Sequence, residues 1–283
     1  MAELKGESVR NKISSVTFGL FVFIFTLFSC AGCISISKNS GHIIRTTTGD
    51  VLQKESSLFP IESFVHTKQN FLIASEICSS DGECQNQIIG NSTSVASGVI
   101  VKSSTTNSYV LTAGHVCVPP APNTSIPGEV SVSYKITVQT GFGRKADMTL
   151  IAVDPENDLC LLSADRYLGP GLSVQKEDTK LHAKIYNMAS PNGLGTSLAV
   201  PVFDGYYIGR VANRTMFTLP AAPGSSGSPI MNDKNEIITV VSAAAIRFDE
   251  FAICPTTESV RAFLLANLPI KKKKSLIEKL KGE

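Results

Sequence analysis

The sequence contains little charge and no marked excess of either sign. Charged residues make up 18% of the 283 residues, and 26 Lys and Arg stand against 24 Asp and Glu. Nucleic-acid-binding domains are typically far more basic, so the composition argues against nucleic acid as a partner. Disordered chains combine low hydrophobicity with high net charge, whereas 43% of these residues are hydrophobic, which excludes a mainly disordered protein. The length suits one large domain or two small ones.

Amphipathic helical patterns are almost absent. Between about residues 66 and 255, short apolar runs rich in β-branched and aromatic residues alternate with Gly, Pro, Asn and Asp. The predicted strands are 94–101, 108–116, 130–140, 148–153, 181–189, 197–211, 215–219 and 236–245. Helical spacing of apolar residues occurs at 257–268. The pattern predicts an all-β sandwich or barrel that one C-terminal helix closes.

One long uncharged run stands apart from this pattern. Residues 13–37 carry no charged side chain, and a helix of about 20 apolar residues spans a bilayer. Basic residues precede the run, so we expect residues 1–12 to stay in the cytoplasm and the remainder to be exported. A retained signal anchor, a cleaved signal peptide and a bacterial lipoprotein signal ending at Cys33 are the three alternatives.

The exported part divides into three regions. Residues 38–65 are rich in Ser, Thr, Lys and Gly, as expected of a tether, and the β pattern with its helix occupies residues 66–268. Residues 269–283 form a basic tail, which is either solvated or in contact with an acidic surface such as anionic lipid. We therefore expect a membrane-anchored protein whose β domain is periplasmic or extracellular, with a lipoprotein or secreted form as the alternative.

Three short motifs within the β domain carry side chains suited to one chemistry. His115 ends an apolar strand, Asp158 precedes an apolar run, and Ser226 lies between Gly224 and Gly227. Each alone is typical of an ordinary strand end or turn. Together they supply a nucleophilic hydroxyl, a base with a pKa near neutrality, and a carboxylate that orients that base. Backbone N–H groups of the Gly-containing turn could bind a developing oxyanion.

These motifs resemble those of the chymotrypsin-like serine proteases, which carry His, Asp and Ser in this chain order. The Asp and Ser motifs are similar to those of the HtrA-type branch. The similar segments are 97–101, 112–115, 157–162, 221–229 and 240–242, within about residues 90–268. The sequence ends about 15 residues after the predicted helix, so the expectation is a member of that branch without its C-terminal PDZ domain.

The resemblance implies a fold and a set of roles. The fold would be two six-stranded antiparallel β-barrels with the active site in the cleft between them. Ser226 would be the nucleophile, His115 the general base and acid, and Asp158 the orienting carboxylate. The N–H groups of Gly224 and Ser226 would form the oxyanion hole. Ser225 is the alternative nucleophile, but only Ser226 keeps the glycine spacing of the motif.

The resemblance also implies the reaction and the substrate class. The reaction would be peptide-bond hydrolysis through an acyl-enzyme, with a protein or peptide substrate and no cofactor. The strand that pairs with the substrate backbone would hold Ser242, Ala243 and Ala244. Small residues there favour a small or apolar residue on the acyl side of the scissile bond. Asp249 or Glu250 could instead reach the pocket and favour Lys or Arg.

Two other functions compete with proteolysis. A catalytically inactive barrel that serves as a binding module is the main alternative, because folds outlast their chemistry. A non-peptidase acyl hydrolase is disfavoured, because its His would come last in the chain. The sequence gives no indication of the oligomeric state.

Seven cysteines are present, an odd number. Cys78 and Cys84 flank an Asp-Gly turn signal, which predicts a disulfide at a hairpin tip in an oxidising compartment. No second Cys or His pair lies at zinc-ligand spacing, so we expect no metal. A bridge between Cys117 and Cys160 is conceivable. Otherwise these two residues and Cys254 would be small buried side chains.

Overall fold

The computed structural model describes residues 42–45, 59–78, 84–118, 130–195, 199–245 and 248–269. The predicted membrane segment, residues 13–37, lies outside these ranges. The strands are β1 (His42–Arg45), β2 (Phe64–Cys78), β3 (Cys84–Ser103), β4 (Ser108–Ala113), β5 (Val130–Thr140), β6 (Lys145–Asp154), β7 (Leu159–Ala164), β8 (Lys184–Met188), β9 (Ala199–Val211), β10 (Arg214–Thr218), β11 (Pro229–Met231), β12 (Ile237–Val240), β13 (Ala243–Ala245) and β14 (Phe248–Pro255). The helices are η1 (Ile61–Ser63), η2 (Gly114–Val116), η3 (Pro191–Gly193) and α2 (Thr257–Asn267).

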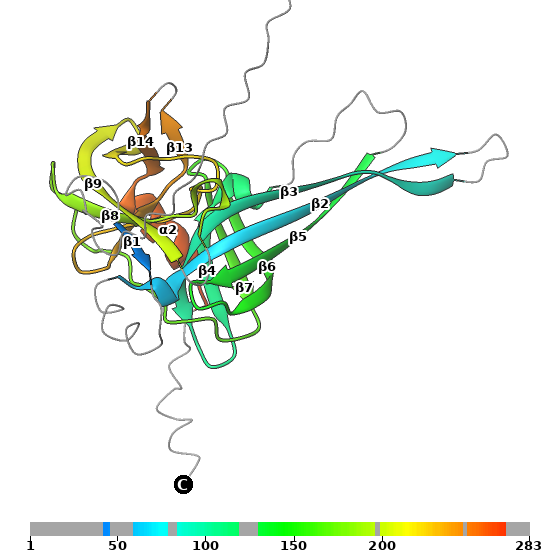
Figure 1. Ribbon diagram of the computed structural model, residues 1–283, viewed down its shortest axis with the longest axis horizontal. Helices are drawn as coiled ribbons and strands as arrows, with labels where there is room; N and C mark the ends of the chain where they lie inside the picture. The colour runs from blue at the N-terminus through cyan, green and yellow to red at the C-terminus, as the bar shows by residue number, and fades with distance from the viewer. Residues whose placement is uncertain are drawn as a thin grey trace, which may run out of the picture. The chain divides into compact units, whose positions relative to one another are not determined.

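The first barrel closes in the order β2-β3-β4-β7-β6-β5 (Figure 1). Alternate residues of its strands point inward and exclude water from one apolar core. The core residues include Val65, Ile100, Val110, Ile136, Val138 and Leu162. This half of the fold confirms the predicted six-stranded antiparallel barrel.

The second half corrects the prediction of another closed six-stranded barrel. Its eight strands form an open, curled sheet in the order β12-β11-β8-β9-β10-β14-β13, with β1 paired to β9. β12 and β13 lie at opposite ends of this order, yet only Val241 and Ser242 separate them in sequence. The Val241 N–H donates to the carbonyl of Ser228, which precedes β11. The Ser242 N–H donates to the carbonyl of Ile253 in β14. The sheet must therefore curl to bring its ends together, but these consecutive segments do not pair with each other.

A shared apolar cluster joins the two halves through the C-terminal helix. The α2 residues Val260, Phe263 and Leu264 pack against barrel and sheet residues together. Thr256 caps the helix by accepting a hydrogen bond of 3.1 Å from the Ser259 N–H. The predicted helix at 257–268 is therefore confirmed, and its apolar face covers the seam between the barrel and the sheet.

Part of the barrel continues into a three-stranded arm (Figure 1). We define the arm as residues 70–78 of β2, 84–93 of β3 and 130–135 of β5, which pair only with one another. β2 is its central strand. The sequence did not predict strands over most of this region, because its many Ser, Asn and Gln residues give a weak strand signal.

Segments before residue 66 also take part in the fold. β1 pairs with β9, and Ile61 and Phe64 are buried in a core cluster. The predicted tether, residues 38–65, therefore includes parts of the β domain. Within the described ranges, no helix combines the length and the apolar character needed to cross a bilayer.

Candidate active site

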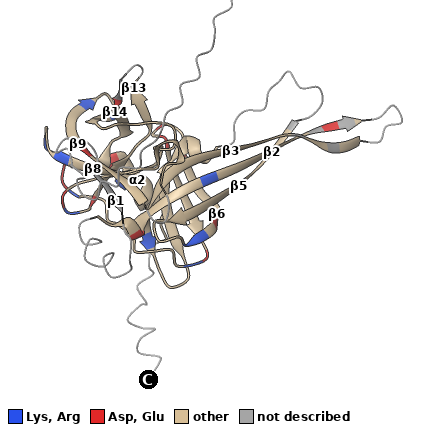
Figure 2. Ribbon diagram, viewed as in Figure 1, with Lys and Arg blue, Asp and Glu red and all other residues tan. Residues whose placement is uncertain are grey.

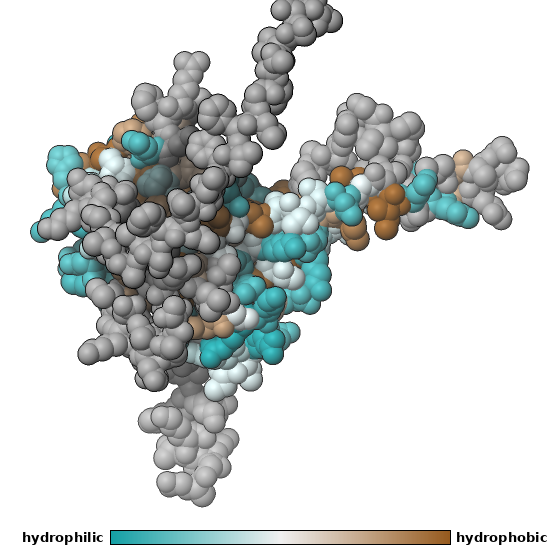
Figure 3. All heavy atoms as spheres, viewed as in Figure 1, coloured by the Kyte–Doolittle hydropathy of each residue, from teal (hydrophilic) through white to brown (hydrophobic). Residues whose placement is uncertain are grey.

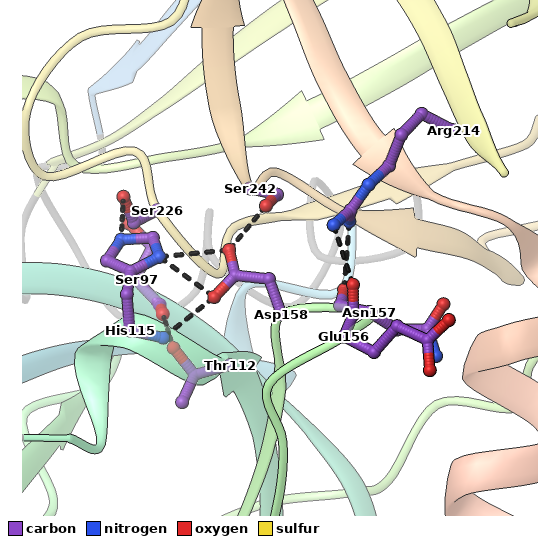
Figure 4. Close-up of polar contacts among 9 residues, drawn as sticks. All are labelled: Ser97, Thr112, His115, Glu156, Asn157, Asp158, Arg214, Ser226 and Ser242. Atoms are coloured by element: carbon purple, nitrogen blue, oxygen red, sulfur yellow. Dashed lines mark hydrogen bonds and ion pairs between the residues drawn. The ribbon is translucent and has the colours of Figure 1, made fainter. Parts of the chain in front are cut away.

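His115, Asp158 and Ser226 lie in an unbroken row of hydrogen bonds (Figure 4). The His115 ring Nδ1 is 2.9 Å from Asp158 Oδ2, and its Nε2 is 2.9 Å from Ser226 Oγ. An ionised carboxylate only accepts hydrogen bonds, so Nδ1 carries the proton and Nε2 accepts from the Ser226 hydroxyl. The side chain of His115 is 51% exposed and that of Asp158 is 18% exposed. The ring is thus open to a substrate, while the carboxylate behind it is largely covered.

Strand pairing within the first barrel brings His115 and Asp158 together. His115 lies in η2, which follows β4 directly, Asp158 directly precedes β7, and Ala113 is the cross-strand partner of Leu159. The His115 backbone N–H also donates to Asp158 Oδ1 at 2.7 Å. Asp158 therefore holds both the backbone and the ring of His115.

The turn before Asp158 is braced from two sides. Asp158 has a φ of 55°, a left-handed conformation that Asp adopts more readily than most residues. Asp154 accepts from the backbone N–H and the side-chain amide of Asn157, at 3.1 and 2.7 Å. Arg214 donates to the carbonyls of Asn157 and Glu156, at 3.1 and 2.8 Å (Figure 4). Sequence reasoning missed Arg214, because a single Arg at the start of a strand forms no motif.

Two glycines shape the loop that presents Ser226. Gly224 and Gly227 have φ values of +96° and +80°, in the region that favours glycine. A Cβ on Gly224 would lie 2.3 Å from the carbonyl oxygen of Ser190, and one on Gly227 would lie 2.1 Å from Thr112 Oγ1. Close packing as well as conformation therefore requires glycine on both sides of the two serines.

The same loop distinguishes Ser226 from Ser225. Ser225 is only 1% exposed, and its Oγ accepts a long hydrogen bond of 3.4 Å from the N–H of Ala222. Ser226 Oγ instead faces the His115 ring. The geometry thus favours Ser226 over Ser225 as the nucleophile, in agreement with the glycine spacing of the motif.

The peptide groups that carry the N–H groups of Gly224 and Ser226 are held through their carbonyl oxygens. The Pro223 carbonyl accepts a backbone hydrogen bond of 2.5 Å from η3, and the Ser225 carbonyl accepts one of 2.9 Å from three residues further on. In a trans peptide the N–H lies opposite the carbonyl. Neither N–H has an acceptor within the described part of the chain. The two donors are fixed and available, as binding of an oxyanion requires.

Ser97 ties this loop to the first barrel. It is fully buried, its N–H donates to the Ser226 carbonyl at 2.8 Å, and its Oγ donates to the Gly224 carbonyl at 2.8 Å. Ser97 Oγ also accepts from the Ser190 N–H at 3.0 Å, and its carbonyl accepts from Thr112 Oγ1 at 2.7 Å. Ser97 lies in the segment 97–101, which resembles the protease family, but the sequence assigned it no role. Its hydrogen-bond partners are far away in sequence, so no local sequence pattern indicates them.

The residues predicted to pair with a substrate lie at one end of the second sheet. Ser242 Oγ donates a short hydrogen bond to Asp158 Oδ2 (Figure 4). β13 begins at Ala243 and pairs with β14, and no described strand pairs with its other edge. Ala243 is exposed and Ala244 is half-buried. An extended peptide could therefore add to this edge.

Comparisons with known proteins identify the family and the fold. The chain matches the family model of the trypsin-like peptidase domain over residues 96–240, which is just over half of its length. The chain belongs to this family. A search of curated protein sequences found no significant match.

Solved bacterial structures share the fold of this trypsin-like peptidase domain. A serine endoprotease from Yersinia pestis superposes with a TM-score of 0.53 at 16% identity, over 79% of this chain and 67% of that one. The active form of the Rv3671c protease from M. tuberculosis gives 0.51 at 19% identity, over 79% and 88%. An inactive mutant form of Rv3671c gives 0.50 at 17% identity, over 81% and 100%. At these identities the likeness shows the fold alone.

Two disulfides reinforce the trypsin-like domain. Cys78 pairs with Cys84, where β2 and β3 end in the arm. Cys117 pairs with Cys160, which the sequence left open. This second bridge links residues that lie two positions after His115 and two after Asp158, so it spans the same strand ends that bring these side chains together. Cys254 is a buried free thiol, and burial raises its pKa.

The described residues offer little to a metal ion. Glu76, Cys78 and Cys84 are the one group of three possible ligands found in that part of the chain, and both sulfurs are consumed in the disulfide. A single exposed carboxylate remains there, which is not a metal site.

Opposing effects act on the pKa of Asp158. Burial raises this pKa. The hydrogen bonds from the His115 ring and the Ser242 hydroxyl together lower it by more than burial raises it, so the pKa lies below its ordinary value. A carboxyl whose pKa is lower in the folded than in the unfolded chain stabilises the fold above the unfolded value. That contribution is lost as the pH falls through the folded value.

We expect Asp158→Asn to destabilise the domain at neutral pH and to lose this effect in acid. The difference in free energy of unfolding from wild type should be constant well above the ordinary Asp pKa of about 3.9 and should shrink as the pH falls below it. Denaturant unfolding across this range measures it. Asp147→Asn is the matched control, because Asp147 is 67% exposed and pairs with a surface lysine. An Asp158→Asn difference independent of pH would contradict the assigned hydrogen bonds.

Proposed function

We propose that this protein is a serine endopeptidase that hydrolyses peptide bonds through an acyl-enzyme. Ser226 is the nucleophile, His115 the general base and acid, and Asp158 the orienting carboxylate. The observation that carries the proposal is the row of hydrogen bonds from Ser226 Oγ through the His115 ring to Asp158. The trypsin-like family supports it independently.

Each step of the reaction has a group in position. His115 Nε2 takes the proton of Ser226 Oγ as the oxygen attacks the substrate carbonyl carbon. The negative charge that develops on the carbonyl oxygen is bound by the N–H groups of Gly224 and Ser226. Asp158 stabilises the imidazolium, which then protonates the leaving amine, and a water molecule releases the acyl group by the reverse route.

The alternative of an inactive binding module is weaker. A scaffold without chemistry has no need of a His ring held at both nitrogens and a serine loop with two unoccupied N–H donors. Such groups are costly to arrange, because they constrain two glycines and a left-handed Asp. The two functions are separated by chemical labelling of the serine.

A fluorophosphonate probe should label the wild-type protein and Ser225→Ala but not Ser226→Ala. Asp158→Asn should fold and yet lose about 10⁴ in turnover, because the imidazole would adopt the wrong tautomer. In-gel fluorescence and peptide hydrolysis measure the two effects. Equal labelling of wild type and Ser226→Ala would reject the proposed nucleophile and favour the binding module.

We further propose that the residue on the acyl side of the scissile bond is small or apolar. Ala222 is half-buried and precedes the nucleophile loop, and the small residues Ala243 and Ala244 follow Ser242, which donates to Asp158. A peptide-library cleavage profile should show Ala, Val or similar residues at that position. A strong preference for Lys or Arg would instead indicate an acidic pocket formed with Asp249 or Glu250.

Residues 13–37 are proposed to anchor the protein in a membrane with the peptidase domain on the extracytoplasmic side. Two disulfides support an oxidising compartment. Full-length protein should stay with the membrane after alkaline extraction. Protease added to cells whose outer layer has been made permeable should degrade it. A soluble product that begins after residue 37, or a lipidated one that begins at Cys33, would replace the anchor with the corresponding alternative.

A further inference from the structure

A groove beside the C-terminal helix leaves apolar side chains in contact with water. Its volume is about 340 Å³, and its lining comes from α2, the end of β3 and the segment at 172–174. Leu265 is 79% exposed, the highest value among the exposed large hydrophobic residues of the described chain. Covering this surface would release water from it, so the groove favours an apolar occupant. We call it the α2 groove, and its apolar lining is Val101, Leu172, Val174, Leu264, Leu265 and Leu268.

Two cations flank this apolar lining, and no carboxylate among the described residues joins them. Lys102 and Arg261 are the charged residues of the groove. The Lys102 ammonium donates to the Pro269 carbonyl. The Arg261 guanidinium donates to the carbonyls of Gln175 and Lys176. Within the described ranges neither cation forms an ion pair. Both side chains are therefore held beside the groove with their positive charge uncompensated.

The sequence that follows the groove carries more charge of the same sign. Pro269 lines the groove, and the basic tail begins at this residue. Residues 269–283 include six Lys and two Glu, and four of the lysines are consecutive at 271–274. A dense group of lysines next to exposed apolar side chains is typical of proteins that bind the surface of an anionic bilayer.

The arm provides a contrast, because its exposed apolar side chains have no unpaired cation beside them. Leu72 and Ile88 are 45% and 64% exposed, and Figure 3 shows hydrophobic side chains on the arm. No charged residue occurs from Cys84 to Val101, and Figure 2 shows β3 without either charge colour along the arm. The arm's Lys135 pairs with Asp147 at 2.9 Å. Exposed apolar surface and unpaired cations therefore coincide at the α2 groove and not on the arm.

The charges decide between the possible occupants of the α2 groove. The tail of the same chain would bring the lysines of 271–274 towards Lys102 and Arg261, and like charges repel. A second copy that used the same surface would place identical cations opposite one another. An anionic bilayer supplies negative headgroups for the cations and hydrocarbon for Leu265. The proposed anchor at 13–37 would keep such a surface at a high local concentration.

We propose that the α2 groove and the basic tail form a second membrane contact, which is selective for anionic lipid. The headgroup phosphates pair with Lys102, Arg261 and the lysines of 271–274, and Leu265 enters the boundary between headgroups and acyl chains. Salt weakens the contact, because it screens these charges. The contact would fix the orientation of the domain at the membrane, which a single anchor leaves free. This inference goes beyond the peptidase function and does not depend on it.

Hydrogen exchange of the full-length protein in lipid nanodiscs tests the contact. Discs of phosphatidylcholine alone are compared with discs in which about a third of the lipid is phosphatidylglycerol. Amides of residues 264–283 should exchange about tenfold more slowly in the anionic discs, and about 0.5 M NaCl should remove the difference. Amides of the arm should exchange equally in both. Equal exchange of residues 264–283 in the two kinds of disc would overturn the proposal.

Variants locate the contact on the groove. Leu265→Ser should fold, because the side chain is 79% exposed, and it should lose most of the extra protection. Arg261→Gln and the replacement of all four lysines at 271–274 by Gln should lose it as well. Leu72→Ser and Lys135→Gln are the matched controls on the arm and should keep it. Unchanged thermal unfolding shows that each variant is folded. Protection that survives Leu265→Ser would assign the contact to the tail alone and contradict a role for the groove.

Exchange in detergent without lipid separates the other occupants. Protection of residues 264–268 there, at any protein concentration, would assign the groove to the tail of the same chain. Protection that increases with protein concentration would assign it to a second copy. Either result would overturn the proposal. Failure of the anchor gives a different result, since a chain without residues 13–37 should co-migrate with anionic discs and not with neutral ones.

Discussion

The site depends on the bonds that the Asp158 carboxylate accepts. The His115 backbone and ring and the Ser242 hydroxyl all donate to it, so the first barrel and the second sheet meet at one side chain. Burial alone would disfavour its ionised form, and these donors reverse that effect. Because Arg214 of the second sheet also braces the turn before Asp158, the relative position of the two halves and the alignment of the His ring are set by the same contacts.

A second consequence of joining a closed barrel to an open sheet is that β13 keeps one edge with which no described strand pairs. β13 ends the open sheet, and β3 runs past the barrel into the arm. A fully closed second barrel would have left no edge at β13. Ser97 connects the barrel to the nucleophile loop, since its N–H donates to the Ser226 carbonyl and its hydroxyl donates to the Gly224 carbonyl.

Much of the fold and of the site follows from local patterns. Alternating β-branched runs predict most of the barrel strands, and helical spacing predicts α2, because each pattern reports a periodic buried face. The three motifs predict which His, Asp and Ser meet, since each requires a particular local turn. The β2 and β3 parts of the arm were missed because polar residues on both faces give no such periodicity. Arg214 and the hydroxyl of Ser97 were missed because their partners are more than 50 residues away in sequence.

The sequence by itself determined the all-β class, the His115, Asp158 and Ser226 set, and the uncharged segment at 13–37, because local composition and spacing suffice for these. Tertiary structure alone decided that the second half stays open, that Cys117 pairs with Cys160, and that the N–H groups of Gly224 and Ser226 find no acceptor within the described residues. These features depend on contacts between distant segments. Strand register and the direction of a peptide plane are set by such contacts, and no short stretch of sequence encodes them.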